Sequence, residues 1–124
     1  MRFCELLSQA RHRVGASQDA VALHLGISRT LISDYEMGRR PAPVLPRVRS
    51  FARFYDLSEA ETDRLLAAAI IEQGGIRLPI DGEDDHDALR LALALISNWH
   101  GLEASHATRM IEVLDEISPS RPRL

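Results

Sequence analysis

The chain has 124 residues, a net charge of −3 and 45% hydrophobic residues, which suits one domain or a small domain with an appendage. It contains no run of 18 apolar residues and no apolar leader, so neither a membrane span nor a signal peptide is expected. The single cysteine, Cys4, excludes an internal disulfide and metal sites built from cysteine pairs, and the cytoplasm is the expected compartment.

Three short helices are predicted at the start of the chain: residues 3–14, a second ending at Gly26, and 29–37. Ser17 and Ser28 precede the second and third helices, where a serine hydroxyl can accept from the free amides of the first turn. A glycine follows each helix and can take the left-handed conformation that ends it. The apolar stripe of the second helix is expected at Ala20, Val21 and Leu23 to Leu25.

The helix at 29–37 has two faces of different character. Ile32 and Tyr35 lie three residues apart and so share one face, which we expect to be buried. The opposite face carries small, hydrogen-bonding side chains: Arg29, Thr30, Ser33 and Asp34. A short helix with such an outer face is what the major groove of DNA accepts.

Two further helices are predicted at about 44–55 and from the capping box at Ser58 to about Gln73, so the expected first domain is 1–73. Residues 74–85 contain glycines, a proline and a run of acids, and are predicted to be a linker. Two helices, 86–100 and 102–117, should form a hairpin, followed by a frayed tail at 118–124. The expected fold is all-α: a five-helix domain and a C-terminal helical hairpin.

Fifteen positions between residues 17 and 41 fit one known pattern in register: Ser17, Gln18, Val21, Ala22, Leu25, Gly26, Ile27, Ser28, Ile32, Ser33, Tyr35, Glu36, Gly38, Arg40 and Pro41. The segment resembles the helix-turn-helix of the Cro/phage-repressor superfamily, often called XRE-like. An ordinary helical hairpin without a nucleic-acid partner is the alternative, and we rank it second because so many positions agree.

The resemblance implies a role for each matching residue. The second helix of the pair would lie in the major groove of double-stranded DNA and read bases with Arg29, Thr30, Ser33 and Asp34. Phosphate contacts would come from Gln18, Ser28, Arg39 and Arg40, although Ser28 could serve only as a cap and Arg40 could be only solvated. Arg11 and Glu36 match positions that pair as a partly buried ion bridge.

Charge is distributed unevenly between the two halves of the chain. Residues 1–57 hold nine arginines and five acidic residues, a net of +4, whereas residues 58–124 have a net of −7. The basic half could bind the phosphates of a nucleic acid, whereas the acidic half should be repelled by them. The resemblance, with which this charge distribution agrees, implies a sequence-specific, DNA-binding transcriptional regulator associated with the nucleoid.

The C-terminal helices, 86–117, carry more apolar surface than one hairpin can cover. Because one such DNA-binding module reads few base pairs, a homodimer is favoured. The expected interface comprises Leu91, Leu95, Trp99, Met110, Ile111 and Leu114. Alternatively, these helices complete a monomer's core. In two further alternatives the acidic C-terminal region binds another protein: the chain would then be an antitoxin or a helical adaptor.

No residue pattern predicts an enzyme, a metal or a cofactor. His86, His100 and His106 lack the spacing of a zinc-binding helix. The acidic run Glu83–Asp84–Asp85 lacks the glycine and glutamate of a calcium loop. We expect it to be a solvated linker that also caps the helix after it.

Overall fold

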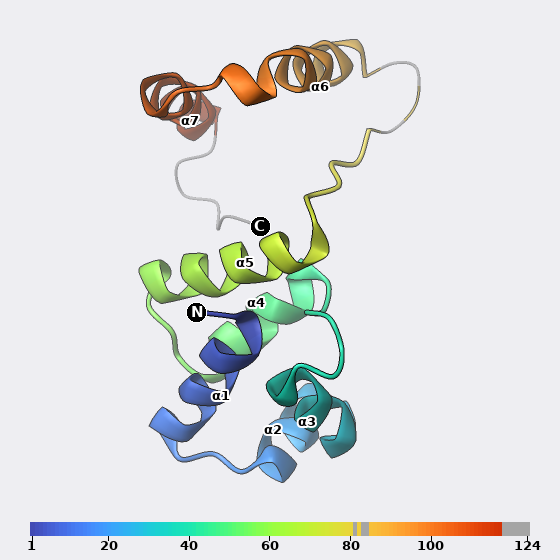
Figure 1. Ribbon diagram of the computed structural model, residues 1–124, viewed down its shortest axis with the longest axis vertical. Helices are drawn as coiled ribbons and strands as arrows, with labels where there is room; N and C mark the ends of the chain where they lie inside the picture. Colours follow the sequence, from blue (N-terminus) through green and yellow to red (C-terminus); the bar gives the residue numbers. More distant parts are fainter. Residues whose placement is uncertain (81, 83–84, 118–124) are drawn as a thin grey trace. The chain divides into compact units, whose positions relative to one another are not determined.

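Seven α-helices and one 3-10 turn make up the described part of the protein, a computed structural model of residues 1–80, 82 and 85–117 (Figure 1). The helices are α1 (Phe3–Val14), α2 (Gln18–Leu25), α3 (Arg29–Met37), α4 (Leu45–Phe54), α5 (Glu59–Gln73), α6 (His86–Asn98) and α7 (Ala104–Ile117). The all-α prediction is confirmed. The predicted tail at 118–124 and the acids Glu83 and Asp84 lie outside the described residues.

The chain separates into two compact units between Ile76 and Arg77. This point falls within the segment 74–85 that the sequence predicts to be a linker. The first unit contains α1 to α5, and the second contains α6 and α7. Each unit is described by itself below.

Local side-chain chemistry accounts for the limits of the helices in the first unit. The Ser17 hydroxyl accepts from the Ala20 amide at 3.0 Å, and the Ser28 hydroxyl accepts from the Leu31 amide at 3.1 Å. Gly26 ends α2 with φ 68° and opens the turn into α3. Gly38 ends α3 with φ 72°, and a methyl group there would lie 3.1 Å from the Arg2 guanidinium.

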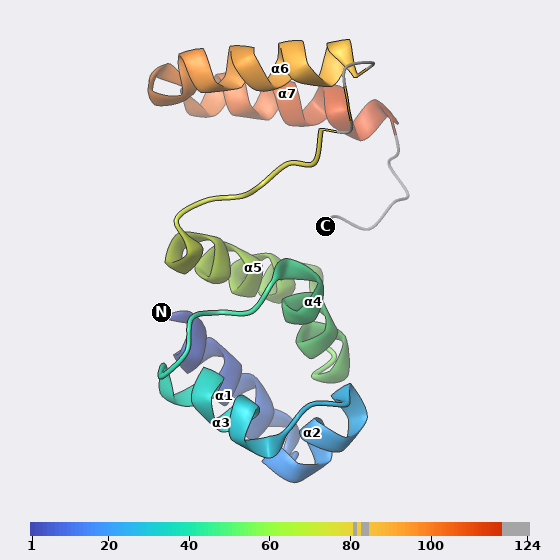
Figure 2. The ribbon, with the colours of Figure 1, turned by 90° about the vertical axis from the view of Figure 1, so that its right-hand side faces the viewer.

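The core of the first unit is built from one face of each of its five helices, seen from two sides in Figures 1 and 2. Its largest fully buried side chains are Tyr55, Phe3, Phe51, Leu7, Ile32, Leu65, Val21 and Val48. Helix α1 packs on α3 and α5, and α4 packs on α5. These contacts hold α3 by its apolar face and leave its other face outward.

The predicted stripe of α2 is wrong in three of its residues. Leu23 is 87% exposed, and Ala20 and His24 are exposed too, whereas Ala22, which the prediction omits, is buried beside Val21. A helix advances about 100° per residue, so positions 21, 22 and 25 face inward together, and position 23 points away. Hydrophobic character alone did not identify the inner face of so short a helix.

The second unit departs further from its prediction. Helix α6 ends at Asn98, and a 3-10 turn, Trp99–Gly101, precedes α7. Helix α7 begins only at Ala104, where the His106 ring accepts from the Glu103 amide at 3.2 Å. Asp85 precedes α6, but its side chain makes no cap hydrogen bond, so the predicted capping role fails for this residue.

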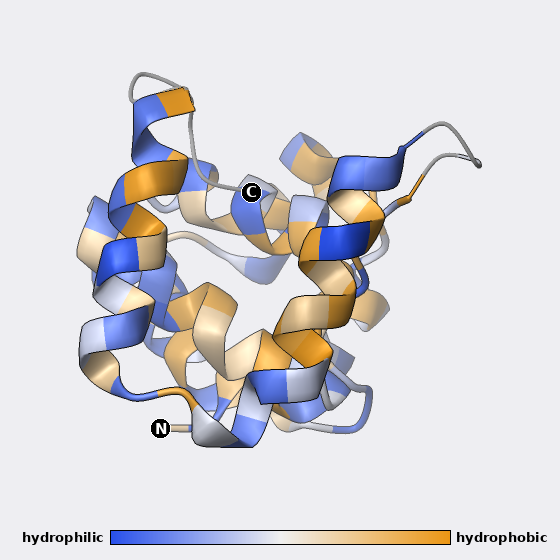
Figure 3. Cartoon of the chain, turned by 90° about the horizontal axis from the view of Figure 1, so that it is seen from above, coloured by the Kyte–Doolittle hydropathy of each residue, from blue (hydrophilic) through white to orange (hydrophobic). Residues whose placement is uncertain are grey.

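Helices α6 and α7 do not form a closely packed hairpin. Figure 1 views both nearly end-on and shows them apart, and neither helix contributes a buried residue. Leu89, Leu91, Leu93, Leu95 and Ile96 lie around much of the circumference of this helix, which predicts that it is buried on more than one side; in the single chain that prediction is wrong, because none of its residues is buried. Hydrophobic residues, orange in Figure 3, nevertheless recur along both helices.

Candidate nucleic-acid interface

The outward face of α3 carries the side chains that the sequence assigns to it. Ile32 and Tyr35 are buried, while Arg29 and Thr30 are exposed at the start of the helix. Ser33 and Asp34 are half-buried on the same outer side. The first two residues are therefore the most accessible to a ligand.

A partly buried polar cluster holds α3 on the side that faces α1. Arg11 of α1 donates from Nε to Glu36 Oε2 at 2.8 Å and from Nη2 to Oε1 at 2.9 Å. Its Nη1 donates to the Ala16 carbonyl at 3.0 Å, and this cluster raises the pKa of Arg11, chiefly through the hydrogen bond to Glu36. Two parallel hydrogen bonds define both distance and orientation, so α3 is held rigidly to α1.

Tyr55 lies in the same part of the core. Its hydroxyl is buried, and among the described residues it has no hydrogen-bond partner. Burial raises the pKa of this phenol well above its ordinary value, and the negative charge of Glu36 raises it further. Tyr55 is therefore neutral and contributes packing to the core, where its ring stacks on Phe51.

Gln18, a predicted phosphate ligand, is turned partly toward the protein. Its side-chain amide donates to Glu36 Oε1 at 3.4 Å, next to the arginine pair. Because the Ser17 hydroxyl takes only the Ala20 amide, the first amides of α2 remain available to an anion. The backbone of this residue is thus better placed for a phosphate than its side chain.

Two arginines on the outer surface have carboxylate neighbours. Arg29 Nε lies 3.7 Å from Asp19 Oδ1, and Arg39 Nη1 lies 3.8 Å from Asp34 Oδ1. The sequence assigned Asp34 and Arg39 to separate contacts, a base and a phosphate, but the structure brings them together. Arg40 is exposed just beyond α3.

Asp19 is the residue of this surface that sequence reasoning missed. It stands in the first turn of α2, ten positions before Arg29, and no pattern of local spacing connects the two. The turn between α2 and α3 brings the starts of both helices together. The sequence does contain one sign of this pair: an acidic residue in the first turn of α2 and an arginine at the first position of α3.

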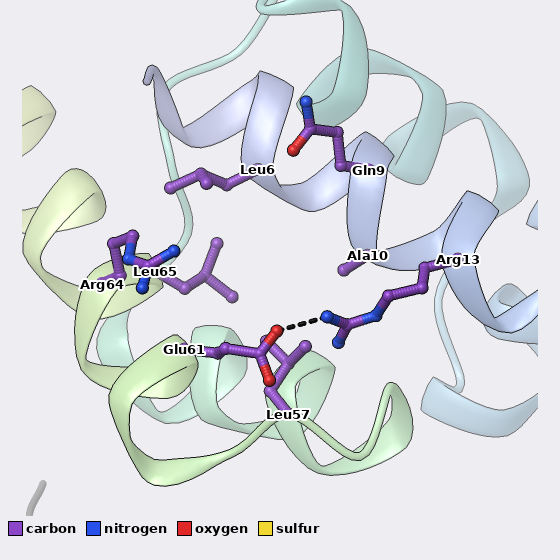
Figure 4. Close-up of a pocket in the computed structure, with 8 residues that line it drawn as sticks. All are labelled: Leu6, Gln9, Ala10, Arg13, Leu57, Glu61, Arg64 and Leu65. Atoms are coloured by element: carbon purple, nitrogen blue, oxygen red, sulfur yellow. Dashed lines mark hydrogen bonds and ion pairs between the residues drawn. The ribbon is translucent and has the colours of Figure 1, made fainter.

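A small hollow lies between α1 and α5, with a volume of about 190 Å³ (Figure 4). Its lining combines apolar and polar side chains, and Arg13 and Glu61 form an ion pair across it. Ligand pockets usually measure about 300 to 1,000 Å³. This hollow is smaller, so we assign it no ligand.

A larger groove, about 720 Å³, separates α6 from α7 in the second unit. Its walls are mainly apolar and include four of the six predicted interface residues: Leu91, Leu95, Met110 and Leu114. The other two, Trp99 and Ile111, are exposed but do not line it. The groove is open to solvent in the single chain.

The described part of the chain contains neither a cluster of metal-ligating side chains nor a helix that could span a membrane. Its histidines, cysteine and carboxylates form no group of three or more that could hold a metal ion. Every helix there is too short or too polar to cross a bilayer.

Comparison with known proteins identifies a family. The helix-turn-helix domain family matches residues 2–65, a stretch that contains α1 to α4 and the first half of α5. No curated protein and no solved structure was found to match the chain. The match covers more than half of the sequence and agrees with the resemblance to XRE-like proteins, and the protein therefore belongs to the helix-turn-helix domain family.

Proposed function

We propose that this protein is a sequence-specific transcriptional regulator that inserts α3 into the major groove of double-stranded DNA. The observation that carries the proposal is the outer face of α3, held outward by the pairing of Arg11 with Glu36. Arg29, exposed at the first position of the helix, can bond O6 and N7 of guanine as a fork. Thr30, Ser33 and Asp34 follow it along the same side.

Phosphates would be bound on either side of these base contacts. The free amides at the start of α2, at Gln18, favour an anion because the positive end of the helix dipole lies there. Arg39 and Arg40 provide positive charge beyond the end of α3, and the Ser28 hydroxyl lies at its beginning. Asp34, beside Arg39, would weaken attraction to phosphate while offering an acceptor to cytosine N4.

The DNA-binding test is a titration of duplex DNA across a salt series. We expect binding to weaken steeply with salt, because each neutralised phosphate releases counterions. Arg29→Ala should reduce the binding free energy for the preferred site by roughly 1–3 kcal/mol. It should also weaken the base preference at one position of that site. Arg40→Ala should instead weaken all sequences and reduce the salt slope by about one.

Arg64→Ala is the matched control, because Arg64 is an exposed arginine on α5, outside the helix-turn-helix. It should leave both the affinity and the salt slope unchanged. Absence of duplex binding by the wild-type protein at low salt would reject the proposal. An equal loss on all sequences in Arg29→Ala would reject the base-reading role of Arg29.

We further propose that the protein acts as a homodimer and that the groove between α6 and α7 receives the helices of a second copy. Both helices expose large apolar side chains, and burying a leucine stabilises an assembly by about 1.5–3 kcal/mol. A second copy would supply the same kind of apolar surface in return. Two recognition helices would then read half-sites about 34–36 Å apart.

Two leucines of α6 test the interface in a matched way. Leu91 lines the groove and is 50% exposed, whereas Leu93 is 56% exposed and does not line it. Leu91→Asp should yield a monomer in sedimentation velocity, while Leu93→Asp should remain a dimer. A dimeric Leu91→Asp variant, or a wild-type monomer, would reject the interface.

A further inference from the structure

The guanidinium of Arg29 has a carboxylate beside it at the protein surface. Asp19 Oδ1 lies 3.7 Å from Arg29 Nε, and the two side chains are 80% and 66% exposed. Asp19 belongs to the first turn of α2, and Arg29 is the first residue of α3. The pair therefore joins the starts of the two helices at the end of α3 where the base-reading residues begin.

The position of the carboxylate determines which part of Arg29 stays available. A guanidinium has five N–H groups in a fixed planar fork. Asp19 approaches from the Nε side, so the two terminal Nη groups remain unobstructed by it. These terminal groups are sufficient to bond O6 and N7 of one guanine together.

We propose that Asp19 is a positioning residue that orients Arg29 for guanine, an inference that rests on the proposed function. An arginine whose Nε is attracted by a carboxylate loses less side-chain freedom when it binds a base, which favours the base that it fits. The interaction differs from that of Asp34 with Arg39, where the carboxylate approaches a terminal nitrogen, Nη1. The nitrogen nearest to Asp19 is thus Nε of Arg29, whereas the nitrogen nearest to Asp34 is a terminal one of Arg39.

Asp19 acts on DNA in a second, opposite way. Its negative charge stands in the first turn of α2, where phosphate is proposed to bind, and repels the DNA backbone there. Removal of this charge should strengthen binding to DNA of any sequence. Loss of the orienting role should lower the preference for guanine, whereas loss of the negative charge should raise the affinity for DNA of any sequence. One experiment that measures both quantities can therefore separate the two roles.

The experiment selects bound duplexes from a randomised pool, using the full-length wild type and the variants Asp19→Asn, Arg29→Ala and the double variant. We expect Asp19→Asn to lower the preference for guanine at one position about two- to fivefold, the range of an exposed ion pair. The same variant should bind random-sequence duplex more tightly at low salt. In the Arg29→Ala background, Asp19→Asn should leave the base preference unchanged.

Two controls keep the result interpretable. Glu59→Gln removes an exposed acid from α5, outside the helix-turn-helix, and should change neither observable. Asp19→Glu retains the charge and should restore part of the guanine preference. The unfolding midpoint of each variant establishes that the domain is intact.

The inference and the proposed function fail in different ways. If Asp19→Asn binds all sequences more tightly with its guanine preference unchanged, Asp19 acts through charge alone and the inference is wrong. If the wild-type protein binds no duplex, the proposed function is rejected and the inference falls with it.

Discussion

At the scale of single residues, Asp56 holds a left-handed backbone, with φ 51°, the one such non-glycine residue in the described chain. It follows the end of α4, where its amide donates to the Arg53 carbonyl at 3.1 Å. A left-handed conformation costs an L-residue roughly 1–2 kcal/mol, and an aspartate tolerates it better than most. The strain allows the chain to turn sharply from α4 into α5.

Asp56→Gly should therefore raise the free energy of unfolding by about 0.5–1 kcal/mol, because glycine adopts this φ without a Cβ clash. Urea denaturation measures the change. Arg53→Gly, at an exposed position in the last turn of α4, is the control and should lower stability by about 1 kcal/mol. Destabilisation by both variants would contradict the account of Asp56.

The pairing of Arg11 with Glu36 is the second feature at this scale. The side chains are only 14% and 4% exposed, so loss of one partner leaves the other charged and poorly solvated. Glu36→Leu should lower the free energy of unfolding by about 3 kcal/mol.

The double variant Arg11→Met with Glu36→Leu is the decisive control for this pair. It removes both charges, so it should recover most of the lost stability in urea denaturation. Recovery of the free energy of unfolding would show that the ion pair orients α3 on α1 more than it stabilises the fold. A double variant as unstable as Glu36→Leu alone would show that the uncompensated charge was not the cause.

At the scale of helices, Arg13 of α1 and Glu61 of α5 connect two elements that are distant in sequence. The hydrogen bond from Arg13 lowers the pKa of Glu61 from 4.5 to about 2, with help from the amide and hydroxyl of Ser58. A carboxyl whose pKa is lower in the folded state stabilises the fold above its unfolded pKa. That contribution is lost as the pH falls from about 4.5 through about 2.

Wild-type protein should thus be more stable than Glu61→Gln at neutral pH and lose this advantage as the solution approaches pH 2. Glutamine can still accept from the Ser58 amide, so the variant removes the charge and keeps the capping geometry. Thermal unfolding across this pH range measures the difference. A difference that persists unchanged at pH 2 would contradict the role of the ionised carboxylate.

At the scale of the whole molecule, the two units differ in how much they bury. Every buried residue of the described chain lies at or before Ala69, in the first unit. The second unit presents apolar side chains to an open groove instead. The first unit therefore contains a core of its own, whereas α6 and α7 contribute no buried residue.

A fragment of residues 1–76 should accordingly fold alone, with a single cooperative transition and the unfolding midpoint of that unit in the full chain. Circular dichroism during urea denaturation measures both. If the proposed dimer is correct, the fragment should be monomeric and should bind a palindromic site more weakly than the full chain. An unfolded fragment would show that its stability depends on the residues after Ile76.

The sequence by itself determined the five helices of the first unit, the serine caps of α2, α3 and α5, the glycines that end α1, α2, α3 and α5, and the apolar and polar faces of α3. These features depend on residues within about four positions of one another, and the patterns of capping and periodicity express them directly. The pairing of Arg11 with Glu36 was also predicted, but only because these positions match a pair in a known family. No rule of local spacing leads from one residue to the other.

Only the tertiary structure decided which distant groups meet. Asp19 reaches Arg29 across a turn, and Glu61 reaches Arg13 across 48 positions, because helix packing brings these charges within reach. The same holds for α6 and α7, which were predicted to form a hairpin and whose apolar residues line an open groove between them. The apolar residues of a helix identify the face that is stabilised by burial. Which other segment packs against that face depends on the path of the backbone in the folded protein.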